Sequence, residues 1–269
     1  MSGFFKRLGI GALFGLAIVL SASASESPVL SFGVSPQHSP GEQAKLWIPI
    51  CQYISKRTGQ QIQFKTSKDL ATYWKEAEAG AFDLLYINPY HFIKAQKDAG
   101  YRVLGKDATP LVAMLITRRD GPEELEWLKG EKVAVHDVSS FVIAFVRHGY
   151  LKDQGIKIEP VGVGSVESVF LAVDKGLYPA GVTIQRAWGL LDPAAQAKFT
   201  VLWKSDPLPP FAYGVHPRVA PQVAEAIRQA LFAMNNDAEG RALLAKVNIK
   251  AIVPGKDSDF NSMRKLRLE

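Results

Sequence analysis

The sequence predicts an α/β fold made of two lobes. Short apolar runs alternate with helical segments, which is the order expected of a parallel sheet whose strands are connected by right-handed helical crossovers. This alternation occurs twice, first over residues 29–100 and again over residues 132–184. A chain of 269 residues is long enough to form two compact cores.

The first lobe opens with a predicted strand at 29–34 and a helix at 42–58. The helix carries an apolar face and ends at Gly59, a residue that often closes helices. A second strand at 61–65 and a second helix at 70–79 repeat the same unit. The apolar face of the first helix, at 42–58, consists of Leu46, Ile50, Tyr53 and Ile54.

The third unit, residues 82–100, is the most informative part of the chain. Residues 83–87 form an apolar run without alternation, typical of a strand covered on both faces. Asn88 is a good helix N-cap, Pro89 suits the first helical position and Gly100 ends the helix. In open α/β sheets ligands bind outside the carboxyl ends of the strands, beside helix N-termini. The candidate ligand-binding residues here are Tyr86, Asn88, Tyr90 and His91, with ordinary packing and a solvated histidine as the alternative.

The second lobe offers a matching position at Ser139 and Ser140. These serines follow a predicted strand at 132–136 and begin a mostly apolar helix at 140–151. Helix capping alone is enough to explain these two serines. If they face Asn88 and Tyr90 across a cleft, they would cap the helix and also contact a ligand.

Two segments are predicted to connect the lobes. The apolar run at 111–117 is a strand that leaves the first lobe, and a proline cluster at 207–210 accompanies the return. Two helices, at 221–235 and 237–246, then complete the first lobe. The predicted organisation is a leader at 1–24, the first part of lobe one at 25–114, lobe two at 115–205, and the return to lobe one at 206–269.

The N-terminus predicts export to the periplasm. Lys6 and Arg7 precede an apolar run at 8–20, and a small-residue cleavage signal ends at Ala24. The run is too short to span a membrane comfortably, so it indicates a secretory signal peptide. Removing it takes away two positive charges and changes the net charge from +6 to +4.

The composition excludes several classes of protein. The remaining positive charge is spread over many segments, without the dense tract of a nucleic-acid-binding protein. Cys51 is the only cysteine and lies in an apolar helical pattern, which indicates a buried thiol. The five histidines lack the short spacings of most zinc sites, although His38 and His91 both follow first-lobe strands. The Gly-x-Ser-x-Gly nucleophile elbow of serine hydrolases is also absent from the sequence. The sequence therefore predicts neither an enzyme nor a metal or cofactor site.

Several segments together resemble the PhnD-like family of periplasmic phosphate, phosphite and phosphonate binding proteins of ABC transporters. They are FGVSPQHSP at 32–40, YISKRTG at 53–59, AGAFDLLYINPYHFIKA at 79–95, LKGEKVAVHD at 128–137 with the helix ending LKDQGI at 151–156, and PPFAYGVHPRVAPQVAEAIRQALFAMNNDAEGRALL at 209–244. The resemblance implies a type II periplasmic binding protein, with two α/β lobes joined by two crossover strands that close on a solute. It also implies a small anionic solute, an inner-membrane ABC permease as partner, and a monomer.

The chain departs from this family at its ligand motif. The family's Ser-Thr-Ser-Gly stretch falls on residues 140–143, where Ser140 is followed by Phe141, Val142 and Ile143. The family's following Ser-His pair and acidic residue also have no His or Asp here. Two hypotheses follow: a binding protein for uptake of a small oxyanion such as phosphate, phosphite or phosphonate, or a sensory or accessory protein that binds another organic ligand and signals to a membrane partner.

Overall fold

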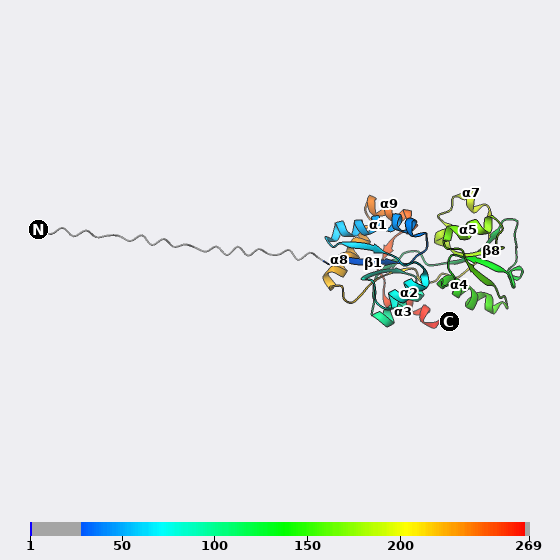
Figure 1. The fold of residues 1–269 in the computed structure, drawn as a ribbon, viewed down its shortest axis with the longest axis horizontal. Helices are drawn as coiled ribbons and strands as arrows, with labels where there is room; N and C mark the ends of the chain where they lie inside the picture. The colour runs from blue at the N-terminus through cyan, green and yellow to red at the C-terminus, as the bar shows by residue number, and fades with distance from the viewer. Residues whose placement is uncertain (2–27, 267–269) are drawn as a thin grey trace.

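The computed structural model describes residues 28–266 together with Met1. Residues 2–24 of the signal peptide that is predicted at 1–24 lie outside the described residues. The described chain forms two α/β lobes side by side, one with a six-stranded sheet and one with a five-stranded sheet (Figure 1). Within the described part of the chain, no helix is both long enough and apolar enough to cross a membrane.

The first lobe begins with three parallel strands, as the alternation predicts. Strand β1 (Leu30–Val34) pairs in parallel with β2 (Ile62–Lys65) on one side and β3 (Leu84–Ile87) on the other. The connecting helices are α1 (Pro40–Thr58) and α2 (Leu70–Glu78), and α3 (Pro89–Ala99) follows β3. Gly59 and Gly100 end α1 and α3 with positive φ angles of 68° and 71°, the left-handed conformation that glycine adopts without strain.

The rest of the first sheet is antiparallel, because the chain re-enters it from the second lobe. Strand β10 (Ala212–Val215) lies between β3 and β4 (Arg102–Asp107) and runs antiparallel to both. A two-residue strand, β11 (Ile252–Val253), is added at the β4 edge. Helices α8 (Pro221–Ala233) and α9 (Ala238–Lys246) follow close to the predicted positions, and the chain continues in a 3₁₀ helix, η3 (Asp257–Lys265).

The second sheet has the order β7-β6-β8-β5-β9. Its central strand β8 pairs in parallel with β6 and antiparallel with β5. Its strands are β5 (Ala113–Arg118), β6 (Lys132–Val135), β7 (Glu159–Gly162), β8 (Ala180–Ile184) and β9 (Phe199–Lys204). Its helical segments are η1 (Leu125–Leu128), α4 (Phe141–Phe145), η2 (Val146–Leu151), α5 (Val166–Asp174), α6 (Gln185–Trp188) and α7 (Pro193–Gln196). The predicted helix over 140–151 forms, and its second half, η2, is a π-helix.

The two chain segments between the lobes pair with each other. An antiparallel bridge joins Leu111 to Leu208, with N–H to O distances of 3.1 and 2.8 Å. The strand predicted to begin at residue 111 therefore begins at Ala113, inside the second sheet. The predicted lobe bounds stay a prediction; strand β5 of the second sheet begins at Ala113, two residues before the predicted start of lobe two.

The lone cysteine lies in the core of the first lobe, as predicted. Cys51 in α1 is 2% exposed, and burial raises the pKa of its thiol to about 12. At neutral pH the thiol is therefore protonated and unreactive.

Candidate ligand-binding site between the lobes

A cavity of about 550 Å³, including its part open to solvent, lies between the two lobes. Its walls come from the carboxyl ends of strands and the first turns of helices in both lobes, where α/β folds place ligands. The lining residues are Gln37, Leu70, Trp74, Asn88 and Phe211 from the first lobe and the crossover, and Val135, His136, Ser140, Phe141, Val142, Ile143, Val166, Val182, Thr183 and Ile184 from the second.

Asn88 and Ser140 occupy equivalent places in the two lobes, each just before the helix that follows a buried strand. The Asn88 Oδ1 atom accepts a hydrogen bond from the His91 N–H at 3.0 Å, and the Ser140 Oγ atom accepts one from the Val142 N–H at 3.3 Å. Both residues are only 4% exposed. Capping uses acceptor positions only, so the Asn88 amide N–H groups and the Ser140 O–H remain available as donors.

Two further polar groups lie at strand ends in the second lobe. Thr183, near the end of β8, is 6% exposed, and His136 directly follows β6. Among the described residues, neither the Thr183 Oγ1 atom nor the buried His136 Nε2 atom has a hydrogen-bond partner. Burial lowers the pKa of His136 to about 4, so its imidazole is neutral at pH 7. Buried polar groups in proteins are normally paired, so these two atoms are candidates for contacts with a ligand.

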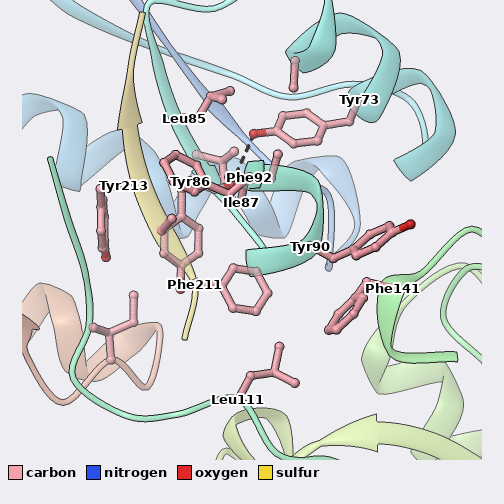
Figure 2. Packing of buried hydrophobic residues seen from close by; sticks show 14 of the residues in the cluster. Tyr73, Leu85, Tyr86, Ile87, Tyr90, Phe92, Leu111, Phe141, Phe211 and Tyr213 are labelled. Atoms are coloured by element: carbon pink, nitrogen blue, oxygen red, sulfur yellow. Dashed lines mark hydrogen bonds between the residues drawn. The ribbon is translucent and has the colours of Figure 1, made fainter. Parts of the chain in front are cut away.

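Aromatic and aliphatic side chains make up the rest of the wall. Phe141 of the second lobe stacks on Tyr90 of the first, with ring centroids 5.6 Å apart and planes inclined by 13° (Figure 2). Val142 and Ile143 follow in the same helix and line the cavity. The residues that replace the Ser-Thr-Ser-Gly stretch therefore close one side of the cavity with apolar surface.

Hydrogen bonds join the lobes beside the cavity, at the cavity-lining residues Leu70 and Trp74. The Trp74 Nε1–H donates to the Ser139 carbonyl at 3.3 Å, and the Leu70 N–H donates to Asp137 Oδ2 at 3.2 Å. These contacts describe a form of the protein in which the lobes are closed.

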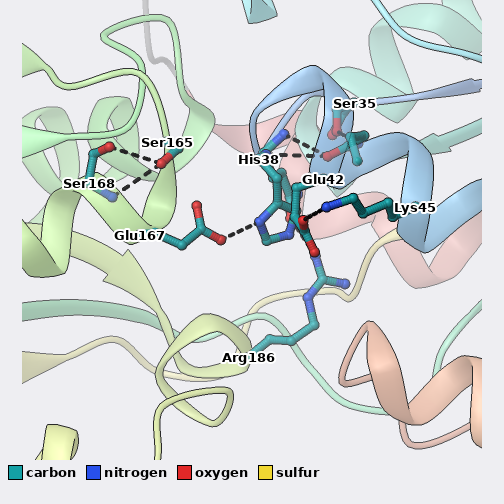
Figure 3. Close-up of polar contacts among 10 residues, drawn as sticks. Ser35, His38, Glu42, Lys45, Ser165, Glu167, Ser168 and Arg186 are labelled. Atoms are coloured by element: carbon teal, nitrogen blue, oxygen red, sulfur yellow. Dashed lines mark hydrogen bonds and ion pairs between the residues drawn. The ribbon is translucent and has the colours of Figure 1, made fainter.

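An ionisable contact joins the lobes at a second place. His38 Nδ1 lies 2.5 Å from Glu167 Oε1, which belongs to the first turn of α5 (Figure 3). Burial acts to raise the pKa of Glu167, but its hydrogen bonds, above all the one with His38, lower it to about 2. Glu167 is therefore ionised at neutral pH.

The structure brings two of the six predicted site residues to the cavity wall, Asn88 and Ser140. Tyr86 is fully buried, and its hydroxyl donates to Asp107 Oδ2 at 2.6 Å. Tyr90 packs on Phe141, and Ser139 contributes its carbonyl to the contact with Trp74. Whether any of the six binds a ligand stays a prediction.

The sixth predicted residue, His91, is buried under an aromatic side chain. Its ring stacks on Trp74 with centroids 3.9 Å apart, and burial lowers its pKa to about 3. The part of the chain that the structure describes contains no cluster of three or more His, Cys, Asp or Glu side chains that is suited to a metal.

Several lining residues were not predicted. His136 and Thr183 obey the strand-end rule that identified Asn88, so the sequence contained a usable signal for them. Gln37, Trp74 and Phe211 reach the cavity through tertiary packing, and no local pattern marks them.

Two lobes with crossover segments, closed around a cavity at the strand ends, define a solute-binding protein of the periplasmic type II class. The family model for the periplasmic phosphonate substrate-binding protein of ABC transporters matches residues 32–260. The chain therefore belongs to this family, whose members are substrate-binding proteins of ABC uptake systems that work with a membrane permease. The family is one of transport proteins and not of enzymes.

Solved structures share this fold. A binding protein component of an ABC phosphonate transporter from Pseudomonas aeruginosa superposes with a TM-score of 0.78 at 18% identity, over 88% of this chain and 85% of the other. PhnD1 from Prochlorococcus marinus, in complex with methylphosphonate, gives 0.76 at 11% identity, over 88% and 96%. A Xanthomonas citri protein bound to ATP gives 0.70 at 17% identity, over 89% and 95%. At these identities the similarity is one of fold.

Proposed function

We propose that this protein delivers a small phosphonate to an inner-membrane ABC permease and binds it in the cavity between the lobes. The observation that carries the proposal is the pair of buried polar atoms, His136 Nε2 and Thr183 Oγ1, that have no partner among the described residues. Together with the donors left at Asn88 and Ser140, they provide neutral hydrogen-bonding groups around one small space. A water-excluded set of donors suits an oxyanion better than the same donors in solvent.

The rest of the wall suits the organic part of the ligand. Phe141, Val142 and Ile143 present apolar surface on the same side as Ser140. Among the described residues that line the cavity, none is Lys, Arg, Asp or Glu. The proposed ligand is therefore an anion held by hydrogen bonds rather than by an ion pair, with a small alkyl group against the apolar wall.

We also propose that the leader at 1–24 is removed on export, leaving a monomer in the periplasm. Mass spectrometry of the periplasmic fraction measures the N-terminus directly, and the expected species begins near Ser25. An intact Met1 in that fraction would contradict the cleavage.

The ligand is tested by isothermal titration calorimetry with methylphosphonate, phosphite, phosphate, sulfate and ATP. Methylphosphonate is expected to bind and ATP is not, because the described residues that line the cavity include no Lys or Arg to pair with the highly charged triphosphate. Failure of every oxyanion, with binding of an uncharged organic solute instead, would overturn the proposal and favour the sensory alternative.

A matched pair of variants locates the site. Ser140→Ala and Asp192→Ala each remove a side-chain N-cap, the second from α7, where the Asp192 Oδ1 atom accepts from the Ala195 N–H at 2.8 Å. Both variants are expected to lose about 0.5–2 kcal/mol of unfolding free energy. Only Ser140→Ala is expected to weaken methylphosphonate binding, by about fivefold to tenfold. Equal affinities would mean that Ser140 only caps its helix.

A further inference from the structure

Arg186 is a buried cation that crosses from one lobe to the other. It lies in α6 of the second lobe, directly after β8, and its side chain is 17% exposed. Its side-chain partners among the described residues belong to the first lobe or the returning crossover. Its Nη1 atom lies 3.1 Å from Asp107 Oδ2 and also donates to the Tyr86 hydroxyl, and its Nη2 atom donates to Gln37 Oε1 at 2.8 Å. Its guanidinium lies 4.6 Å from the centre of the Phe211 ring.

The electrostatics of this contact depend on lobe closure. Asp107 is 5% exposed in the closed form, and the hydroxyl groups of Tyr86 and Tyr213 also hydrogen-bond to it. Removing one partner of a buried ion pair leaves an uncompensated buried charge, which is strongly unfavourable. Separating the lobes takes Arg186 away from Asp107 but lets water reach both groups. The ion pair between Arg186 and Asp107 therefore stabilises the closed form relative to the open form.

The same contact reaches the ligand cavity. Gln37 and Phe211 both line the cavity, and both touch Arg186. Because Gln37 gives its Oε1 atom to Arg186, its amide N–H groups remain as donors. Closure through Arg186 thus fixes the orientation of Gln37 and Phe211 at the cavity wall.

We propose that Arg186 is the positioning residue for closure: it holds the two lobes together through Asp107 and sets ligand affinity without touching the ligand. This inference extends the proposed function, because it assigns control of closure at the same site to a residue outside the cavity lining. It does not depend on the identity of the solute, since closure is measurable on the protein alone.

Interlobe distance provides the test. Nitroxide labels are placed on cysteines introduced at Lys97 in α3 and Lys152 after η2, both exposed, while buried Cys51 stays unlabelled. Pulsed electron resonance then measures the distance distribution without added ligand and with saturating methylphosphonate. The wild-type protein is expected to populate the short distance in both conditions, and more fully with methylphosphonate.

Arg186→Met is expected to shift the ligand-free distribution to longer distances and to weaken methylphosphonate binding by about tenfold or more. Asp107→Asn leaves Arg186 buried without its anion, so it is also expected to lengthen the ligand-free interlobe distance and to weaken methylphosphonate binding. The double variant, which leaves neither charge buried, is expected to recover much of the short distance. Such recovery distinguishes a coupled pair from two independent structural roles.

Arg218→Met is the matched control, because Arg218 pairs with Asp83 within the first lobe, Nε to Oδ1 at 2.6 Å. It is expected to leave the distance distribution and the affinity unchanged. If Arg186→Met does not fold, Arg186→Lys keeps the charge but cannot contact Gln37, Tyr86 and Asp107 together, and an intermediate distribution is expected. A wild-type distribution in the folded Arg186 variant would overturn the proposal. If the Arg186 variant shows the expected shift to longer interlobe distances but the wild-type protein does not bind phosphonate, only the ligand assignment is refuted.

Discussion

Thr183 and Thr117 allow a ligand-directed hydroxyl to be distinguished from a structural one. Both are buried threonines of the second sheet, in the neighbouring strands β8 and β5. The Thr117 hydroxyl donates to the Pro122 carbonyl at 3.1 Å, whereas the Thr183 hydroxyl has no partner among the described residues. Replacement of each by valine removes the hydroxyl and keeps the β-branched shape.

The two substitutions should change stability in opposite directions. A buried polar group without a partner costs about 1–3 kcal/mol, so Thr183→Val is expected to raise the unfolding free energy of the ligand-free protein by an amount in that range. Thr117→Val removes a satisfied hydrogen bond and is expected to lower it by about 1 kcal/mol. For a chain of this size, each kcal/mol corresponds to about 2–4 °C in Tm.

Affinity should change only at the cavity. Thr183→Val is expected to weaken methylphosphonate binding by about fivefold to tenfold, the value of one lost hydrogen bond, and Thr117→Val to leave it unchanged. Differential scanning calorimetry gives the stabilities and titration calorimetry the affinities. Loss of stability in both variants, with wild-type affinity in both, would refute the assignment of Thr183 to the ligand.

Two other predictions concern residues near the same cavity. The pKa of His136 is about 4 in the folded protein and about 6.5 when unfolded, so the native state binds fewer protons between these values and unfolding free energy falls as pH drops from 6.5 to 4. In His136→Gln the slope of unfolding free energy against pH should be shallower by up to about 1.4 kcal/mol per pH unit, which urea unfolding measures. Identical slopes in the wild-type protein and the variant would contradict a neutral buried His136. Tyr90→Ala removes the stack on Phe141 and should weaken ligand binding, while Tyr90→Phe keeps the stack and should not. A loss of affinity in Tyr90→Phe would instead indicate that the Tyr90 hydroxyl contacts the ligand.

The parts of the site that sequence reasoning reached are those with a local physical cause. Asn88 and Ser140 follow buried strands and have side chains that cap helices, so their place at the strand ends follows from short-range chemistry. Arg186 also follows a strand end, but its proposed role depends on its ion pair with Asp107, which is 79 residues earlier in the chain. The pairing of the two crossovers at Leu111 and Leu208 likewise depends on contact between distant segments. Such contacts leave no periodic pattern in the sequence.

The replacement of hydroxyls by Phe141, Val142 and Ile143 has a consequence for ligand choice. The donors of this cavity come partly from neighbouring strands, through His136 and Thr183, while the α4 residues form an apolar wall. An alkyl group of a phosphonate would lie against that wall, and each buried CH₂ contributes about 0.8 kcal/mol.

Affinity should therefore rise from phosphite to methylphosphonate to ethylphosphonate by about fourfold per carbon, until the cavity is filled. Titration calorimetry at a single pH compares the series. In Val142→Thr, which adds a hydroxyl to the wall at nearly constant shape, the gain per carbon should shrink. Tighter binding of inorganic phosphate than of either alkylphosphonate by the unmodified protein would show that the apolar wall does not contact the ligand.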